Sequence, residues 1–140
     1  MSACGWEADI DYSGLIDDRN WMHPFPEASE LQFLVGEELN QICLGRWQIN
    51  LNFGSVYIAV EGDLDHVDKA GTVRRYNTDE SRLSPLFLHQ LLGQKVRMLE
   101  VEPFRLTLAF KEGDILRILS DEGPYECGQI SDENGIQIVF

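Results

Sequence analysis

Two stretches of the chain alternate apolar and polar side chains with the two-residue period of a β-strand. The apolar members are Trp47, Ile49, Leu51 and Phe53 in the first stretch and Phe104, Leu106, Leu108 and Phe110 in the second. A strand of this pattern buries one face and wets the other, as in an antiparallel sheet that covers a core. Both stretches therefore predict amphipathic strands, and the apolar side chains on their inward faces (the inward stripes) are expected to contribute most to the stability of the fold.

Each stretch is the middle of a predicted three-stranded meander. Short turns at 54–55 and 111–114 follow the two stretches, because they hold glycine among small or charged residues. The flanking strands are expected at 37–44 and 56–60 in the first meander, and at 95–101 and 115–119 in the second.

The two meanders begin alike and keep one spacing. Leu34-Val35-Gly36 precedes the first and Leu91-Leu92-Gly93 the second, and the offset between these two segments also aligns Trp47 with Phe104. Any two meanders share a period of two, so the strand patterns alone say little. The common start and the constant spacing favour an internal repeat of residues 34–62 and 91–120.

Turn and cap residues complete a predicted α+β fold that is mostly antiparallel sheet. Ser84-Pro85 and Gly93 bound a short helix at 85–92, and another short helix is expected near 30–35. Residues 61–81 are polar and predict a loop, whereas Asn134-Gly135 predicts a C-terminal hairpin. Residues 30–140 are expected to be one domain, preceded by an acidic, partly packed arm at 1–29. The halves could form one sheet, a sandwich or a partial barrel.

The net charge of −13 on 140 residues narrows the possible partners. Such a charge repels nucleic-acid phosphates and anionic lipid, so neither is an expected partner. No stretch approaches the ~20 apolar residues of a membrane span. The first residues lack the basic and apolar regions of a signal peptide, and three scattered cysteines do not predict a disulfide framework. A cytoplasmic location is therefore expected.

No motif of the chain predicts catalysis, a metal site or a cofactor. Asp63, Asp65, His66 and Asp68 resemble a ligand cluster, but the glycine and glutamate that an EF-hand loop requires are absent. The thiol of Cys127 lies beside Glu126, whose charge disfavours a thiolate. The glycines form no nucleotide-binding loop. The enzymatic class stays open, and a non-enzyme is favoured.

A set of motifs in residues 34–140 resembles a family of small bacterial proteins without an assigned activity. The residues that carry the resemblance are Gly45-Arg46-Trp47, Leu51-Asn52-Phe53 and Val60-Glu61-Gly62 in the first half, and Leu91-Leu92-Gly93, Leu106–Phe110, Gly113 and Tyr125-Glu126 in the second. The resemblance implies a bacterial origin and names no function.

Two classes of function fit these observations. The first is a small acidic module that binds a basic protein, with a toxin-neutralising immunity protein as its sharpest form. Its predicted contact residues are the acids of turns and loops: Asp63, Asp65, Asp68, Asp121, Glu122 and Glu126. The alternative is a small-molecule binder or enzyme with its site between the two halves.

Overall fold

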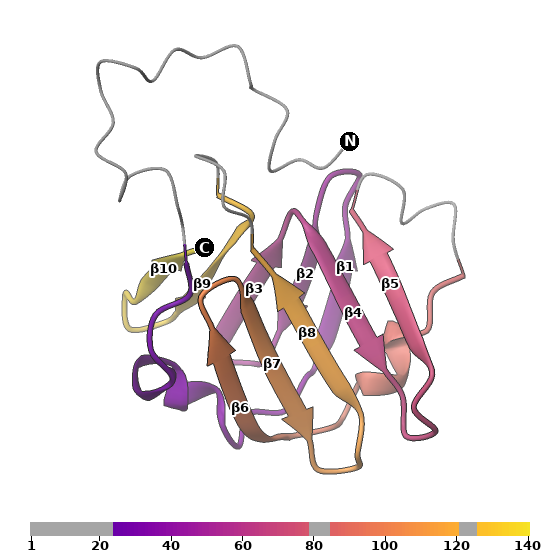
Figure 1. Ribbon diagram of the computed structural model, residues 1–140. Helices are drawn as coiled ribbons and strands as arrows, with labels where there is room; N and C mark the ends of the chain where they lie inside the picture. The colour runs from indigo at the N-terminus through magenta and orange to yellow at the C-terminus, as the bar shows by residue number, and fades with distance from the viewer. Residues whose placement is uncertain (1–23, 79–84, 121–125) are drawn as a thin grey trace.

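The computed structural model of the protein describes residues 24–78, 85–120 and 126–140. These residues form ten antiparallel strands in two sheets of five (Figure 1). The strands are β1 (Gln41–Leu44), β2 (Ile49–Asn52), β3 (Val56–Val60), β4 (Asp63–Val67), β5 (Val73–Asn77), β6 (Val96–Glu102), β7 (Arg105–Phe110), β8 (Ile115–Leu119), β9 (Gly128–Asp132) and β10 (Gln137–Val139). Within the described residues the helices are two short 3-10 segments, η3 (Ala28–Leu34) and η5 (Leu88–Leu91). The fold is thus largely antiparallel β, at the border of the all-β and α+β classes.

The two sheets lie as two layers with one apolar core between them (Figure 1). The predicted stripes supply the centre of this core: Ile49, Leu51, Phe53, Leu106, Leu108 and Phe110 are all at most 1% exposed. Phe25 closes one side by stacking on Phe140, with ring centroids 4.5 Å apart. From Ile49 to Phe53 and from Leu106 to Phe110, the inward stripes are therefore where the sequence predicts them.

The strand order shows that the hairpin after each meander belongs to the other sheet. One sheet has the order β1-β2-β3-β9-β10 and the other β6-β7-β8-β4-β5. Each meander therefore continues into a hairpin that pairs with the last strand of the other meander: β4-β5 lies beside β8, and β9-β10 beside β3. This exchange makes each sheet depend on both halves of the chain.

Backbone hydrogen bonds at the start of the two meanders are reciprocal. The Gly36 amide donates to the Val96 carbonyl, and the Gly93 amide donates to the Leu39 carbonyl. Both glycines have positive φ, of 90° and 86°, which explains why glycine stands at both places. Glu38 and Lys95, which have the same separation in sequence as the two glycines, form an isolated bridge at the centre of this arrangement.

Strand registers also correspond between the sheets. Met98 pairs with Ala109 and Glu100 with Thr107, and the corresponding residues of the other sheet pair in the same way: Gln41 with Asn52 and Cys43 with Asn50. At the next strand, Thr107 pairs with Arg117 as Asn50 pairs with Ala59. Positions of one meander therefore have counterparts in the other, and the chemistry of the two can be compared residue by residue.

The expectation of a loop over residues 61–81 is wrong, because this segment holds β4 and β5. The strand period is hidden in the sequence because the inward positions are not all apolar. Leu64 and Tyr76 point into the core, but His66 is also fully buried and Arg74 is half-buried. The outward positions are mostly charged or polar, so the segment has the composition of a loop.

Three other boundaries differ from expectation. The helix expected at 85–92 is a 3-10 segment confined to Leu88–Leu91, and the one expected near 30–35 is Ala28–Leu34. The first strand begins at Gln41 rather than residue 37, since the preceding residues form the reciprocal contacts with the second meander. Trp47 is 55% exposed, because it lies in the β1–β2 turn and not on the inward stripe. The C-terminal hairpin is present, with Gly135 at its turn at a φ of 94°.

Truncation of the inward stripes should destabilise the fold. We expect Leu51→Ala and Leu108→Ala each to lower the free energy of unfolding by about 2–5 kcal/mol, because both side chains are fully buried. Leu44→Ala is the matched control: Leu44 is 57% exposed, so this change should cost much less. Urea denaturation of the three variants measures the difference, and equal losses at Leu44 and Leu51 would contradict the assignment of the core.

Candidate functional site

The two sheets differ in charge. The strands β1, β2, β3, β9 and β10 include a single charged side chain, that of Asp132. The other sheet, β4 to β8, is here called the charged sheet, because its strands include Asp63, Asp65, Arg74, Arg75, Arg97, Glu100, Glu102, Arg105 and Arg117. The strand registers of the two sheets correspond, so the difference in charge comes from the side chains and not from a different backbone arrangement. The two outer faces can therefore bind different groups.

The outward face of β1-β2-β3-β9-β10, here called the amide face, consists of two cross-strand rows. One row is Gln41, Asn52, Tyr57, Ser131 and Gln137, and the other is Cys43, Asn50, Ala59, Gln129 and Val139. Five of these ten side chains are amides and none is charged. The Gln137 amide donates to the Gln129 side chain at 2.9 Å, whereas the side-chain oxygen of Asn50 is buried without a hydrogen-bond partner. The face offers hydrogen-bond donors and acceptors without charge.

Two large apolar side chains are exposed at the end of β1 and in the β1–β2 turn. Leu44 ends the edge strand β1, and Trp47 follows in the β1–β2 turn; they are 57% and 55% exposed. The guanidinium of Arg46 lies 4.6 Å from the centroid of the Trp47 ring. Exposed aromatic and aliphatic groups are common at protein contact surfaces.

The structure places three of the predicted acidic contact residues in ion pairs and hydrogen bonds. Both carboxylate oxygens of Asp65 accept from Arg75, at 2.7 and 2.9 Å. Asp68 accepts from Arg74 at 2.9 Å, and this hydrogen bond is the main cause of the lowered pKa of Asp68. The side chain of Asp63 accepts from Asn77 at 2.6 Å. These three acids lie in or next to β4 and are neutralised or bonded from β5.

The remaining predicted acids belong to another part of the chain. Glu126 is exposed, and Asp121 and Glu122 lie outside the described residues. Glu61 lies near Glu126, since its amide donates to the carbonyl of Cys127. Burial, and secondly the charge of Glu126, raise the pKa of Glu61. Among the described residues, neither glutamate has an ion-pair partner, so this region carries uncompensated negative charge.

A buried histidine–aspartate pair joins β4 of the charged sheet to the β7–β8 turn. His66 Nε2 lies 2.8 Å from a carboxylate oxygen of Asp114, and the two side chains are 0% and 3% exposed. The His66 Nδ1 atom is buried without a hydrogen-bond partner. By register, the counterparts of this pair are Ile130 and Val56, both apolar and buried. The fold itself therefore does not require a polar pair at this place.

An open hollow of about 530 Å³ adjoins this pair. Its lining comes from the β4–β5 turn, the η5 region and the β7–β8 turn: Asp68, Lys69, Ala70, Gln90, Gln94, Glu112 and Asp114. Gln94 is 4% exposed, and its side-chain oxygen is buried without a partner. Within the part of the chain that the structure describes, no group of three acidic, histidine or cysteine side chains is placed to hold a metal ion.

The cysteines differ in state. Cys43 is exposed on the amide face with a free thiol, whereas Cys127 is buried and disulfide-bonded, which the scattered cysteines did not predict. No helix of the described segments has both the length and the apolar character of a membrane span.

Comparison of the chain with known protein families, curated proteins and solved structures finds no match. The resemblance to a bacterial family therefore stays a prediction from the quoted motifs. The chemistry of the two outer faces is the remaining guide to function.

Sequence reasoning missed the amide face as a site, although part of its signal was visible. Gln48, Asn50 and Asn52 alternate with the inward stripe and predict a wet face. The contribution of Gln129 and Ser131 was not visible, because only the exchange of hairpins brings β9 beside β3.

The counterpart residues provide a test of the buried pair. We expect the double variant His66→Ile with Asp114→Val to be about as stable as the wild type or more stable, because well-packed apolar groups often replace a buried polar pair without loss. Asp114→Val alone should lower stability by about 1–3 kcal/mol, since it leaves a buried imidazole nitrogen without its hydrogen-bond partner. Thermal and urea unfolding measure both, and a double variant as unstable as the single one would contradict the correspondence.

The raised pKa of the Glu61 carboxyl predicts that the stability of the fold depends on pH. A pKa raised above 4.5 means that the native state holds this proton more tightly than the unfolded state, so the group lowers stability as the pH rises above about that value. We expect Glu61→Gln to be more stable than the wild type at pH 7, with the gain shrinking as the pH falls towards 4.5. Glu133→Gln, at an exposed turn, is the control. A gain that is constant with pH would show that ionisation is not its cause.

Proposed function

We propose that this protein is a protein-binding module whose contact surface is the amide face. The observation that carries the proposal is the absence of charged side chains from both rows of that face, in a chain with 24 acidic and 11 basic residues. Charged residues are depleted at the centre of protein interfaces because their desolvation is costly. Asparagine and serine instead provide adaptable hydrogen bonds and tyrosine a large, rigid contact area, as they do in antibody binding sites.

The strands of the amide face alone cover less area than a stable interface buries, so the proposed contact extends beyond them. Five strands at about 4.8 Å spacing and four to five residues at about 3.3 Å each give a flat area of roughly 20 by 15 Å. Stable interfaces bury about 800 Å² on each partner. Leu44 and Trp47 are exposed at the end of β1 and in the β1–β2 turn, and we assign them to the same contact.

The acidic charge supports a basic partner. Acidic and basic side chains are equal in number within the ten strands, so the excess of negative charge comes from the rest of the chain. The segments 1–23, 79–84 and 121–125 alone hold nine acidic and two basic side chains. Such charge steers a basic protein to the surface and raises the association rate, while the uncharged face makes the close contacts. A toxin-neutralising immunity protein is the specific form of this function that we propose.

We further propose that the two halves arose by duplication of one meander-and-hairpin unit. The reciprocal glycine hydrogen bonds and the matching registers support it. After duplication, one face would have become uncharged and the other charged, so that a single fold presents two different surfaces.

A second candidate is a small-molecule site between the halves. The hollow beside the buried pair favours it, because the β4–β5 and β7–β8 turns both contribute to its lining and Gln94 brings an unsatisfied buried oxygen. The space between the sheets themselves is filled by the apolar core, so a ligand would bind at this open hollow.

Single arginine substitutions at corresponding positions test the contact surface. Asn50→Arg places a charge on the amide face, in β2, and Thr107→Arg places the same charge at the corresponding position of the other sheet. We expect a partner captured from the source cell by the wild type and by Thr107→Arg to be lost with Asn50→Arg, by at least tenfold in affinity. Circular dichroism of both variants checks folding. Equal binding by all three proteins would contradict the assignment.

The same purified partner then tests the role of charge. Its association rate should fall steeply between low and moderate salt while its dissociation rate changes less, because screening acts on the approach of the two proteins. An association rate that is indifferent to salt would show that the partner is not recruited by the acidic segments.

A further inference from the structure

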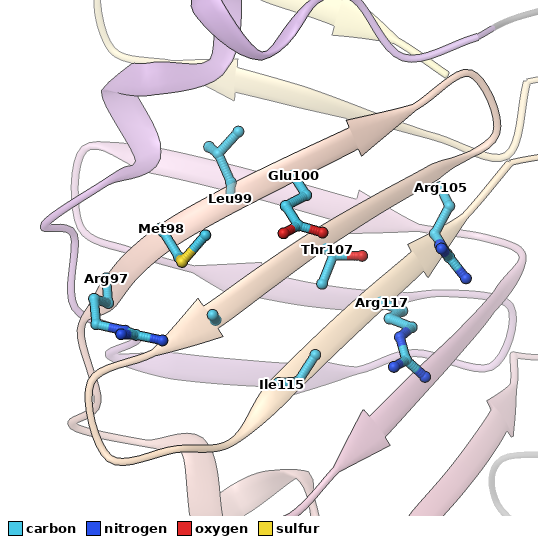
Figure 2. Close-up of a pocket in the computed structure, with 9 residues that line it drawn as sticks. Arg97, Met98, Leu99, Glu100, Arg105, Thr107, Ile115 and Arg117 are labelled. Atoms are coloured by element: carbon cyan, nitrogen blue, oxygen red, sulfur yellow. The ribbon is translucent and has the colours of Figure 1, made fainter.

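A small hollow lies on the outward face of the charged sheet, opposite the amide face of the sandwich. Its volume is about 280 Å³, and three arginines from neighbouring strands line it: Arg97 of β6, Arg105 of β7 and Arg117 of β8 (Figure 2). Glu100 and Thr107 lie between them, and Met98, Leu99, Ala109 and Ile115 supply an apolar part. The hollow thus gathers three of the 11 basic residues of an acidic chain.

Two of these arginines have no carboxylate partner among the described residues. Arg105 pairs with Glu102, but neither Arg97 nor Arg117 forms an ion pair. Arg117 stands directly beside Asp65 in the register, yet both oxygens of Asp65 are bound by Arg75 on the other side. Arg75 therefore satisfies the nearest carboxylate, and the guanidinium of Arg117 remains available.

A β-bulge adds Arg97 to this face. Val96 pairs with Phe110 and Met98 with Ala109, so Arg97 is an extra residue without a partner on β7. The bulge leaves Arg97 and Met98 both exposed on the edge strand. Bulges commonly redirect a side chain next to a binding site.

The sister sheet shows that the fold does not need these arginines. By repeat spacing and register, the counterparts of Arg97, Arg105 and Arg117 are Asn40, Gln48 and Ala59. All three counterparts are uncharged. Like charges around one hollow repel each other, so a bound negative group would explain these arginines where the fold does not.

We propose that this hollow binds a small molecule through an oxyanion group, a carboxylate or a phosphate, held by Arg105 and Arg117 with Arg97 at the rim. Guanidinium groups bind such oxygens in two-point contacts, and a rigid sheet holds them in place. The volume lies just below the ~300–1,000 Å³ of drug-sized pockets, so the ligand is small. This site is separate from the proposed protein contact, since the two lie on opposite outer faces.

Glu100 sets the second requirement for the ligand. Its carboxylate lies beside Thr107 and has no ion-pair partner among the described side chains (Figure 2). It accepts hydrogen bonds and repels negative charge. A ligand with one anionic group and one hydroxyl or amine group fits the hollow better than a simple anion does.

Titration of the full chain with two probes, sodium phosphate and sodium acetate, tests the site at constant ionic strength. Nuclear magnetic resonance of the backbone amides and of the arginine Nε–H groups reports where the anion binds. We expect saturable shifts at Thr107 and Arg117 with at least one probe, and the tighter probe identifies the anionic group. Absence of saturable shifts at these residues with both probes would overturn the proposal.

Substitutions by the sister residues remove the site with little expected effect on the fold. Arg117→Ala and Arg105→Gln should each weaken binding of the tighter probe by about tenfold, because each removes a charged hydrogen bond. Arg46→Ala, in the β1–β2 turn of the other sheet, changes the net charge by the same amount and should leave the affinity unchanged. Glu100→Gln should tighten binding of the same probe. An equal loss with Arg46→Ala, or weaker binding with Glu100→Gln, would overturn the assignment.

Discussion

The burial of two apolar stripes between two sheets is the constraint on which the rest of the structure depends. Leu51 and Leu108 stand at the centre of these stripes and are fully buried. Because a strand alternates its side chains, a fully apolar inner face leaves every second residue free to vary on the outside. The core therefore stabilises the sandwich and also leaves two outer faces whose chemistry is independent of folding.

Those outer faces have different chemistry on the same backbone registers. The positions of Arg117 and Glu100 on one face correspond to Ala59 and Cys43 on the other. The same comparison extends into the core, where His66 corresponds to Ile130. Corresponding positions act as an internal control: a residue type that one sheet has and the other lacks is not explained by the fold.

Local sequence patterns predicted much of the fold, but they did not predict the candidate sites. Alternation around Ile49 and Leu106 and the Asn134-Gly135 turn predicted strands that are present. The segment of β4 and β5 resembles a loop in the sequence, because a buried histidine takes the place of an apolar residue. The acids of that segment then look free, although Arg75 binds Asp65 across the hairpin. An ion pair between strands depends on register, which the composition of a segment does not reveal.

The sequence by itself determined the strands of the two meanders, the inward stripes and the sign of the net charge, since each depends on neighbouring residues or on simple counting. Only the tertiary structure decided that the C-terminal hairpin joins the sheet of the first meander and that the β4–β5 hairpin joins the sheet of the second. That exchange completes the amide face with Gln129 and Ser131, and it places Asp65 between Arg75 and Arg117. Contacts between residues distant in the chain arise from strand pairing, and a period of two cannot specify which strands pair.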